Sequence, residues 1–84
     1  MLSNKNKEVL AKRNLSLKAK GLYVLLLLLK DQGEIIDFKN VSSLVSDGRD
    51  SITTAINELK KKGILSIERL RDDYGRFYES EWLF

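Results

Sequence analysis

A run of eight hydrophobic residues, 22–29, is the feature that most constrains how this 84-residue chain folds. The run lies within segment 17–30, which follows Ser16, a residue type that caps helix N-termini, and precedes Gly33, a residue type that ends helices. The segment therefore predicts a helix of about four turns. Because hydrophobic side chains occupy nearly every angle around this helix, it must be covered on more than one side.

Three parts of the structure are candidates to pack against this helix. They are the N-terminal residues Val9, Leu10 and Leu15, a sheet formed later in the chain, and a second copy of the chain. A homodimer through the leucine-rich helix is thus one of the alternatives. A chain of this length suffices for one domain. We expect a basic N-terminal arm at 1–14 and one folded domain at 15–84.

Two further helices are predicted in the middle of the chain. Ile35 and Ile36 suffice only for a short edge strand, and Asp37 then supplies the N-cap of a short helix. The inward residues expected for that helix are Phe38, Val41, Leu44 and Val45. The Ser-Asp-Gly sequence at 46–48 is a strong turn signal, and a longer helix follows it and ends before Gly63. Its apolar face consists of Ile52, Ala55, Ile56 and Leu59.

The remainder of the chain has the composition of a β-hairpin. Segments 64–71 and 76–84 are rich in β-branched and aromatic residues, and 72–75 separates them with a glycine suited to a left-handed turn position. One face of the second strand would carry Tyr78, Ser80, Trp82 and Phe84. The expected fold class is α+β: three helices, a C-terminal two-stranded hairpin and a short third strand, in the order of a winged helix-turn-helix domain.

The composition argues against an enzyme. Cysteine and histidine are absent, which removes thiolate and imidazole chemistry and the usual zinc ligands. The glutamates show no spacing typical of a paired acid–base site, and no glycine-rich phosphate loop is present. We therefore expect no cofactor and no metal. The longest apolar run is far shorter than the roughly 20 residues of a membrane span, so we expect a cytoplasmic protein without a membrane partner.

Basic charge is concentrated in two places. The net charge is +3, and residues 1–20 carry an excess of +5 while residues 49–63 carry +2. The other two parts of the chain, 21–48 and 64–84, each carry −2. This distribution suits a polyanionic partner, with a solvated lysine surface as the alternative interpretation.

The helix that follows the turn at 46–48 has a polar face suited to a DNA major groove. Asn57 would pair with adenine, Thr53 or Thr54 would contact a thymine methyl or a phosphate, and Arg49 would reach guanine or the backbone. The alternative is an ordinary solvent-exposed face, and lysines near a helix C-terminus also favour the helix dipole. The candidate DNA-binding residues on this helix are Arg49, Ser51, Thr53, Thr54, Asn57, Lys60 and Lys61.

The hairpin adds candidate contacts near its tip. Arg69, Arg71 and Arg76 are suited to a minor groove or to phosphates. Asp72 and Asp73 lie in the same turn and would repel phosphate unless they pair with these arginines.

Several segments carry a resemblance to a known group of proteins. Residues 15–22, LSLKAKGL, resemble the opening of winged-helix domains in phage and plasmid replication initiators, including DnaD-like proteins. Further matches are the stretches 46–50, 55–59, 62–65 and 69–77. The chain is also similar to small conjugative-plasmid DNA-binding proteins of the TcpK kind. The resemblance implies a sequence-specific binder of double-stranded DNA at an origin of replication or transfer, with a relaxase or a replication protein as a further partner.

The sequence departs from this pattern in two ways. We expect no oligomerisation domain of the DnaD-like kind after Phe84, and the hairpin is more acidic than a purely electrostatic contact with DNA would favour. The first departure favours a stand-alone accessory protein or a truncated one. A transcriptional regulator of the same fold and a winged-helix module that binds a protein partner are the alternative functions.

Overall fold

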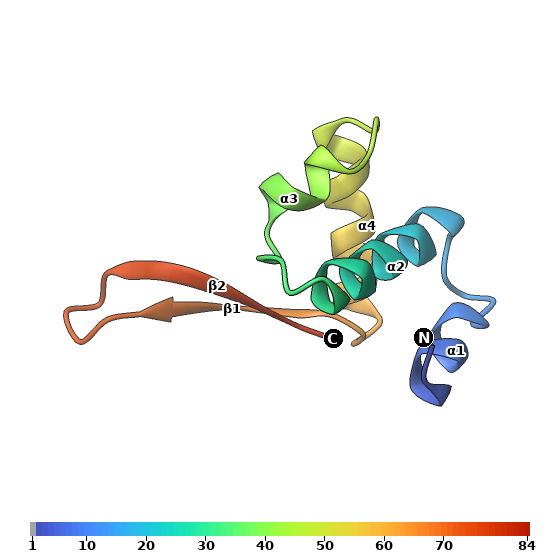
Figure 1. The fold of residues 1–84 in the computed structure, drawn as a ribbon, viewed down its shortest axis with the longest axis horizontal. Helices are drawn as coiled ribbons and strands as arrows, with labels where there is room; N and C mark the ends of the chain where they lie inside the picture. Colours follow the sequence, from blue (N-terminus) through green and yellow to red (C-terminus); the bar gives the residue numbers. More distant parts are fainter. Residues whose placement is uncertain (1) are drawn as a thin grey trace.

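Four helices and one antiparallel hairpin follow one another along the chain (Figure 1). The structure is a computed structural model that describes residues 2–84, except for the side chain of Tyr78. The elements are α1 (Asn4–Leu10), α2 (Leu17–Asp31), α3 (Phe38–Ser43), α4 (Arg49–Lys61), β1 (Ser66–Arg71) and β2 (Phe77–Leu83). The α+β class predicted from the sequence is therefore confirmed.

Helix α2 is the centre of the fold, and its predicted bounds are confirmed within one residue. The Ser16 hydroxyl accepts the Ala19 N–H at 3.1 Å to start the helix, and Gly33, with φ of +70°, ends it in a left-handed conformation. The side chains that α2 buries are Ala19, Leu22, Tyr23, Leu26 and Leu29. None of the helices within residues 2–84 is long and apolar enough to cross a membrane.

The N-terminal segment 1–14 contains a helix, so the described chain has four helices where the sequence predicted three. The Ser3 hydroxyl caps α1 by accepting the Asn6 N–H at 3.2 Å, and Val9 is buried against the core. The Tyr23 hydroxyl donates to Asn6 Oδ1 at 2.9 Å and ties α1 to α2. A seven-residue helix is marginal alone, so this tertiary docking explains why local sequence pattern did not reveal it.

Helices α3 and α4 follow the predicted pattern with one exception. Asp37 Oδ1 accepts the Asn40 N–H at 2.7 Å and caps α3, whose Val41 is fully buried. Leu44 was expected to face inward, but it is 46% exposed because α3 ends at Ser43. The apolar face predicted for α4 is confirmed by the burial of Ile52, Ala55, Ile56 and Leu59.

The predicted third strand at Ile35 and Ile36 is wrong. The sheet within residues 2–84 has only the strands β1 and β2. Ile35 is 73% exposed, and its carbonyl accepts the Asn40 side-chain amide at 2.6 Å. Only three residues separate Gly33, which ends α2, from Asp37, the N-cap of α3. This segment is therefore a short connection between two helices.

The hairpin is anchored at its base and projects at its tip. Ile67 lies opposite Trp82 in the antiparallel register, and both pack against the core together with Phe84. The Phe84 ring meets the Tyr23 ring edge to face, with centroids 6.3 Å apart. Tyr78, predicted on the same face, lies outside the described side chains. The molecule measures 43 × 29 × 26 Å, and the hairpin tip lies at one end of the longest axis (Figure 1).

Candidate nucleic-acid interface

Helix α4 presents a polar face opposite its buried one. The turn at 44–48 brings the chain from α3 into α4, and Gly48 is the N-cap. At 100° per residue, Asp50, Thr54 and Asn57 lie near the middle of the exposed side. The predicted residues that are exposed on α4 are Arg49, Thr53, Thr54, Asn57, Lys60 and Lys61. Six of the seven α4 candidates therefore share one solvent-facing surface.

Thr54 and Arg49 are held in place by neighbouring groups. The Thr54 hydroxyl donates to the Asp50 carbonyl at 2.8 Å, which uses its hydrogen and leaves its methyl group and lone pairs free for a partner. The Arg49 guanidinium carbon lies 4.6 Å from the centroid of the Phe38 ring in α3, at cation–π distance. Both side chains are thus oriented before any partner arrives.

Ser51 does not belong to this exposed surface. It is half-buried on the side of α4 that faces α2, and its hydroxyl accepts the Lys18 ammonium at 3.5 Å. Lys18 is therefore a cation beside the start of α4, although it is not among the DNA-binding residues predicted from the sequence. The sequence offers no local signal for this contact, because 33 residues separate Lys18 from Ser51.

Glu58 lies next to Asn57 in sequence but is turned toward α2. Its two carboxylate oxygens accept the Ser16 N–H and the Ser16 hydroxyl, each at 2.7 Å. These hydrogen bonds, that of the Ser16 N–H first, hold the pKa of Glu58 below its ordinary value. The negative charge of Glu58 is therefore engaged at the start of α2 and set apart from the Asn57 face.

Lys60 and Lys61 lie in the last turn of α4 and are both exposed. Cations at this end interact favourably with the helix dipole, so the fold itself benefits from them. Their exposure also leaves both ammonium groups accessible to an anionic partner.

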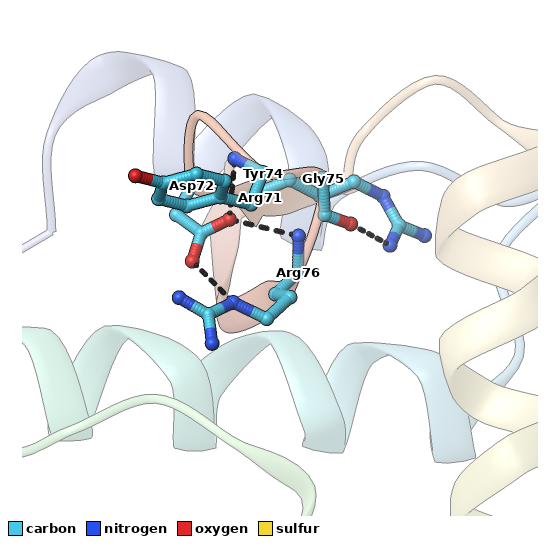
Figure 2. A network of polar contacts seen from close by, with 5 residues as sticks. All are labelled: Arg71, Asp72, Tyr74, Gly75 and Arg76. Carbon is cyan, nitrogen blue, oxygen red and sulfur yellow. Dashed lines mark hydrogen bonds and ion pairs between the residues drawn. The ribbon is translucent and has the colours of Figure 1, made fainter.

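Asp72 organises the hairpin tip (Figure 2). Its Oδ1 accepts the N–H groups of Tyr74 and Arg76, both at 2.9 Å, and its Oδ2 accepts Arg76 Nε at 3.0 Å. The Arg76 N–H is the main reason why the pKa of Asp72 lies below its ordinary value. Arg71 Nη1 donates to the Gly75 carbonyl at 3.1 Å. The sequence predicts that the aspartates of this turn repel phosphate unless they pair with arginines. Asp72 forms such a pair with Arg76.

Arg69 is farther from the tip. It lies on β1 opposite Ser80 and is exposed. The three hairpin arginines are therefore spread from the middle of β1 to the start of β2.

The structure places the predicted residues in two separate groups. Within residues 2–84, no hydrogen bond or ion pair joins the hairpin tip to α4. Comparison with protein-family models, curated proteins and solved structures finds no match to the chain. The comparisons therefore assign no function to either surface.

Proposed function

We propose that this chain is a winged helix-turn-helix protein that binds double-stranded DNA in a sequence-specific manner. In this proposal α3, the turn and α4 form the helix-turn-helix unit, and β1 and β2 form the wing. The observation that carries the proposal is the exposed polar face of α4, which begins directly after the five-residue loop 44–48 and carries lysines at its end.

The chemistry of that face suits base reading. A major groove admits one α-helix, and an amide near the middle of the helix can bond bidentately to adenine, which is the role we assign to Asn57. The free methyl group of Thr54 suits a thymine methyl. Lys60, Lys61 and Arg49 supply charge for the phosphates on either side of the groove.

The wing contributes backbone contacts. In the Asp72–Arg76 pair only Nε of Arg76 is engaged among the described contacts, so its terminal nitrogens are left for a phosphate. Arg71 likewise has one nitrogen bonded to Gly75 and others left over. Since the pair neutralises the charge of Asp72, repulsion of phosphate by the tip is reduced.

The biological setting is proposed from the sequence resemblance to phage and plasmid replication initiators and to TcpK-like proteins. It points to action at an origin of replication or transfer in the cytoplasm, beside a replication protein or a relaxase. A transcriptional regulator would use the same reading surface. The identity of the selected DNA site, an origin or a promoter, distinguishes the two.

A specific observation favours a second copy of the chain as an additional partner. A groove of about 720 Å³ between α1 and α2 is lined by the exposed apolar residues Leu2, Val24 and Leu28. Lys5, Lys30 and Asp31 line the same groove, and we expect a two-fold arrangement in which Asp31 of each copy pairs with a lysine of the other. Sedimentation equilibrium tests this dimer. A Val24→Asp variant should remain monomeric at concentrations where the unaltered chain dimerises. If the unaltered chain is monomeric at every concentration, the dimer is excluded.

The test of DNA binding is selection of sequences from random duplexes, followed by a salt titration on the selected site. We expect enrichment of one site and a steep fall of affinity with salt, because phosphate contacts release counterions. Absence of enrichment together with absence of binding at low salt would refute the proposal.

Two variants test the placement of α4 and of the wing. Asn57→Ala should relax preference at one base and cost about 1–3 kcal/mol, whereas Arg71→Ala should weaken binding to all sequences alike. Gln32→Ala is the matched control for Asn57, because it removes an exposed amide at the far end of α2. Normal site preference in Asn57→Ala would show that α4 does not read bases as proposed.

A further inference from the structure

Two aromatic rings are exposed at the hairpin tip. Tyr74 is 84% exposed and Phe77 is 53% exposed. The turn between β1 and β2 lies at one end of the molecule's longest axis (Figure 1). The turn uses only the backbone N–H of Tyr74, which donates to Asp72. Any residue but proline supplies that donor, so this hydrogen bond of the turn does not require the Tyr74 ring.

The Tyr74 ring is held beside a fixed cation. The Arg76 guanidinium carbon lies 5.3 Å from the centroid of this ring, and Asp72 fixes the Arg76 Nε. Figure 2 shows the ring, the carboxylate and the guanidinium gathered on one side of the turn. Because the ring remains largely exposed beside the cation, an aromatic surface stays available for stacking.

The charges of the tip do not favour a purely electrostatic contact. Between residues 69 and 79 the three arginines are balanced by Asp72, Asp73 and Glu79, which gives no net charge. Attraction of a polyanion to this segment is therefore weak over distances beyond direct contact. The direct phosphate contacts of Arg71 and Arg76 are therefore not reinforced by a wider positive field, and stacking on the aromatic ring is the further interaction that the tip offers.

We propose that Tyr74 stacks on one unpaired nucleobase, with Arg71 and Arg76 contacting the adjacent phosphates. Bases inside an intact duplex already stack on both neighbours, so a base offers a free face only at an end, a gap or a melted segment. Every base has such a face, so the contact tolerates any sequence. The wing would thereby recognise single-stranded DNA next to the duplex site held by α4, and this inference rests on the proposed function.

The test compares two DNA probes with the full chain. One is the selected duplex, and the other is the same duplex with a single-stranded extension that carries 2-aminopurine at the first unpaired position. A stacked base contributes about 1–3 kcal/mol, so the extended probe should bind about 5- to 150-fold more tightly. Stacking should also quench the 2-aminopurine fluorescence.

Three substitutions at Tyr74 separate stacking from general apolar contact. Tyr74→Phe should keep the preference and the quenching, whereas Tyr74→Leu and Tyr74→Ala should lose both and bind the plain duplex within about twofold of the unaltered chain. Ile35→Ala is the control, since it removes another exposed apolar side chain that lies outside the hairpin. Retention of the preference by Tyr74→Leu would overturn the proposal. Equal binding of both probes by the unaltered chain would also overturn it and would favour an apolar contact of the ring with a protein.

A third probe, the single-stranded extension alone, separates this inference from the proposed function. If no duplex binds at all, the proposed function fails. Quenching of the single strand that depends on the aromatic ring at position 74 would still support stacking, and its absence would overturn it.

Discussion

Tyr23→Phe tests whether α1 is held to the rest of the molecule by the contact that the structure shows. The Tyr23 ring is 1% exposed, and its hydroxyl donates to Asn6 Oδ1 of α1 at 2.9 Å. The substitution keeps the ring and its edge-to-face contact with Phe84 but removes the hydroxyl. Because Asn6 is only half-buried, its amide oxygen regains water when the donor is lost.

The expected loss is therefore the net value of one hydrogen bond, about 1 kcal/mol of the free energy of unfolding. For a domain of this size that corresponds to a fall in Tm of about 4–8 °C. Tyr23→Ala removes the ring as well and should cost about 3–5 kcal/mol. Total stabilities of about 0.05–0.15 kcal/mol per residue imply that this larger loss unfolds much of the protein.

Urea denaturation followed by Trp82 fluorescence measures these values, and Tyr74→Phe serves as a control because it removes an exposed hydroxyl. A double-mutant cycle with Asn6→Ala isolates the contact, and the coupling free energy should be about 0.5–1.5 kcal/mol. A coupling indistinguishable from zero would refute the docking of α1 through this bond. A loss above about 2 kcal/mol in Tyr23→Phe would show that the Asn6 side chain is less hydrated than the structure implies.

Two further predictions concern Glu58 and the glycines. The pKa of Glu58 is lowered by its bonds to Ser16, so its contribution to stability is present above the ordinary glutamate pKa of about 4.3 and is lost as pH falls through the lower folded value. Glu58→Gln should therefore lower Tm near neutral pH and approach the unaltered chain in acid, and an equal loss at both pH values would contradict this. Gly75→Ala should destabilise by about 1 kcal/mol because φ is +78°, whereas Gly21→Ala, in a helix with nothing within 4 Å of the added carbon, should stabilise by about 0.5–1 kcal/mol. Chemical denaturation measures both, and the same sign for the two variants would contradict the backbone assignment.

The sequence was sufficient to predict helix starts and left-handed glycines, because these features are set by residues close together in the chain. Ser16 and Asp37 start helices as predicted, and Gly33, Gly63 and Gly75 all have positive φ. Glycine accepts this backbone conformation without strain, and the residue types with capping hydroxyls or carboxylates are few. Such features depend on neighbours within four residues, which a sequence displays directly.

Contacts between distant residues were not predictable in the same way. Asn6 of α1 bonds to Tyr23, and Ser51 of α4 bonds to Lys18, in each case across at least 17 residues. Ile35 has strong strand propensity, but a strand needs a partner, and the segment was too short to acquire one. The sequence indicated that an aspartate of the hairpin turn could pair with an arginine, but not which one. The structure shows that Asp72 pairs with Arg76.

The bond between Glu58 and Ser16 also makes the start of α2 dependent on a residue 42 positions later. The Ser16 hydroxyl accepts the Ala19 N–H while donating to Glu58, so the same side chain caps α2 and holds α4. The Ser16 amide proton is bonded to the Glu58 carboxylate of α4, so its exchange with solvent requires that this bond open. A ligand that holds α4 still would slow that exchange, which makes the Ser16 amide a reporter of events on a surface it does not touch.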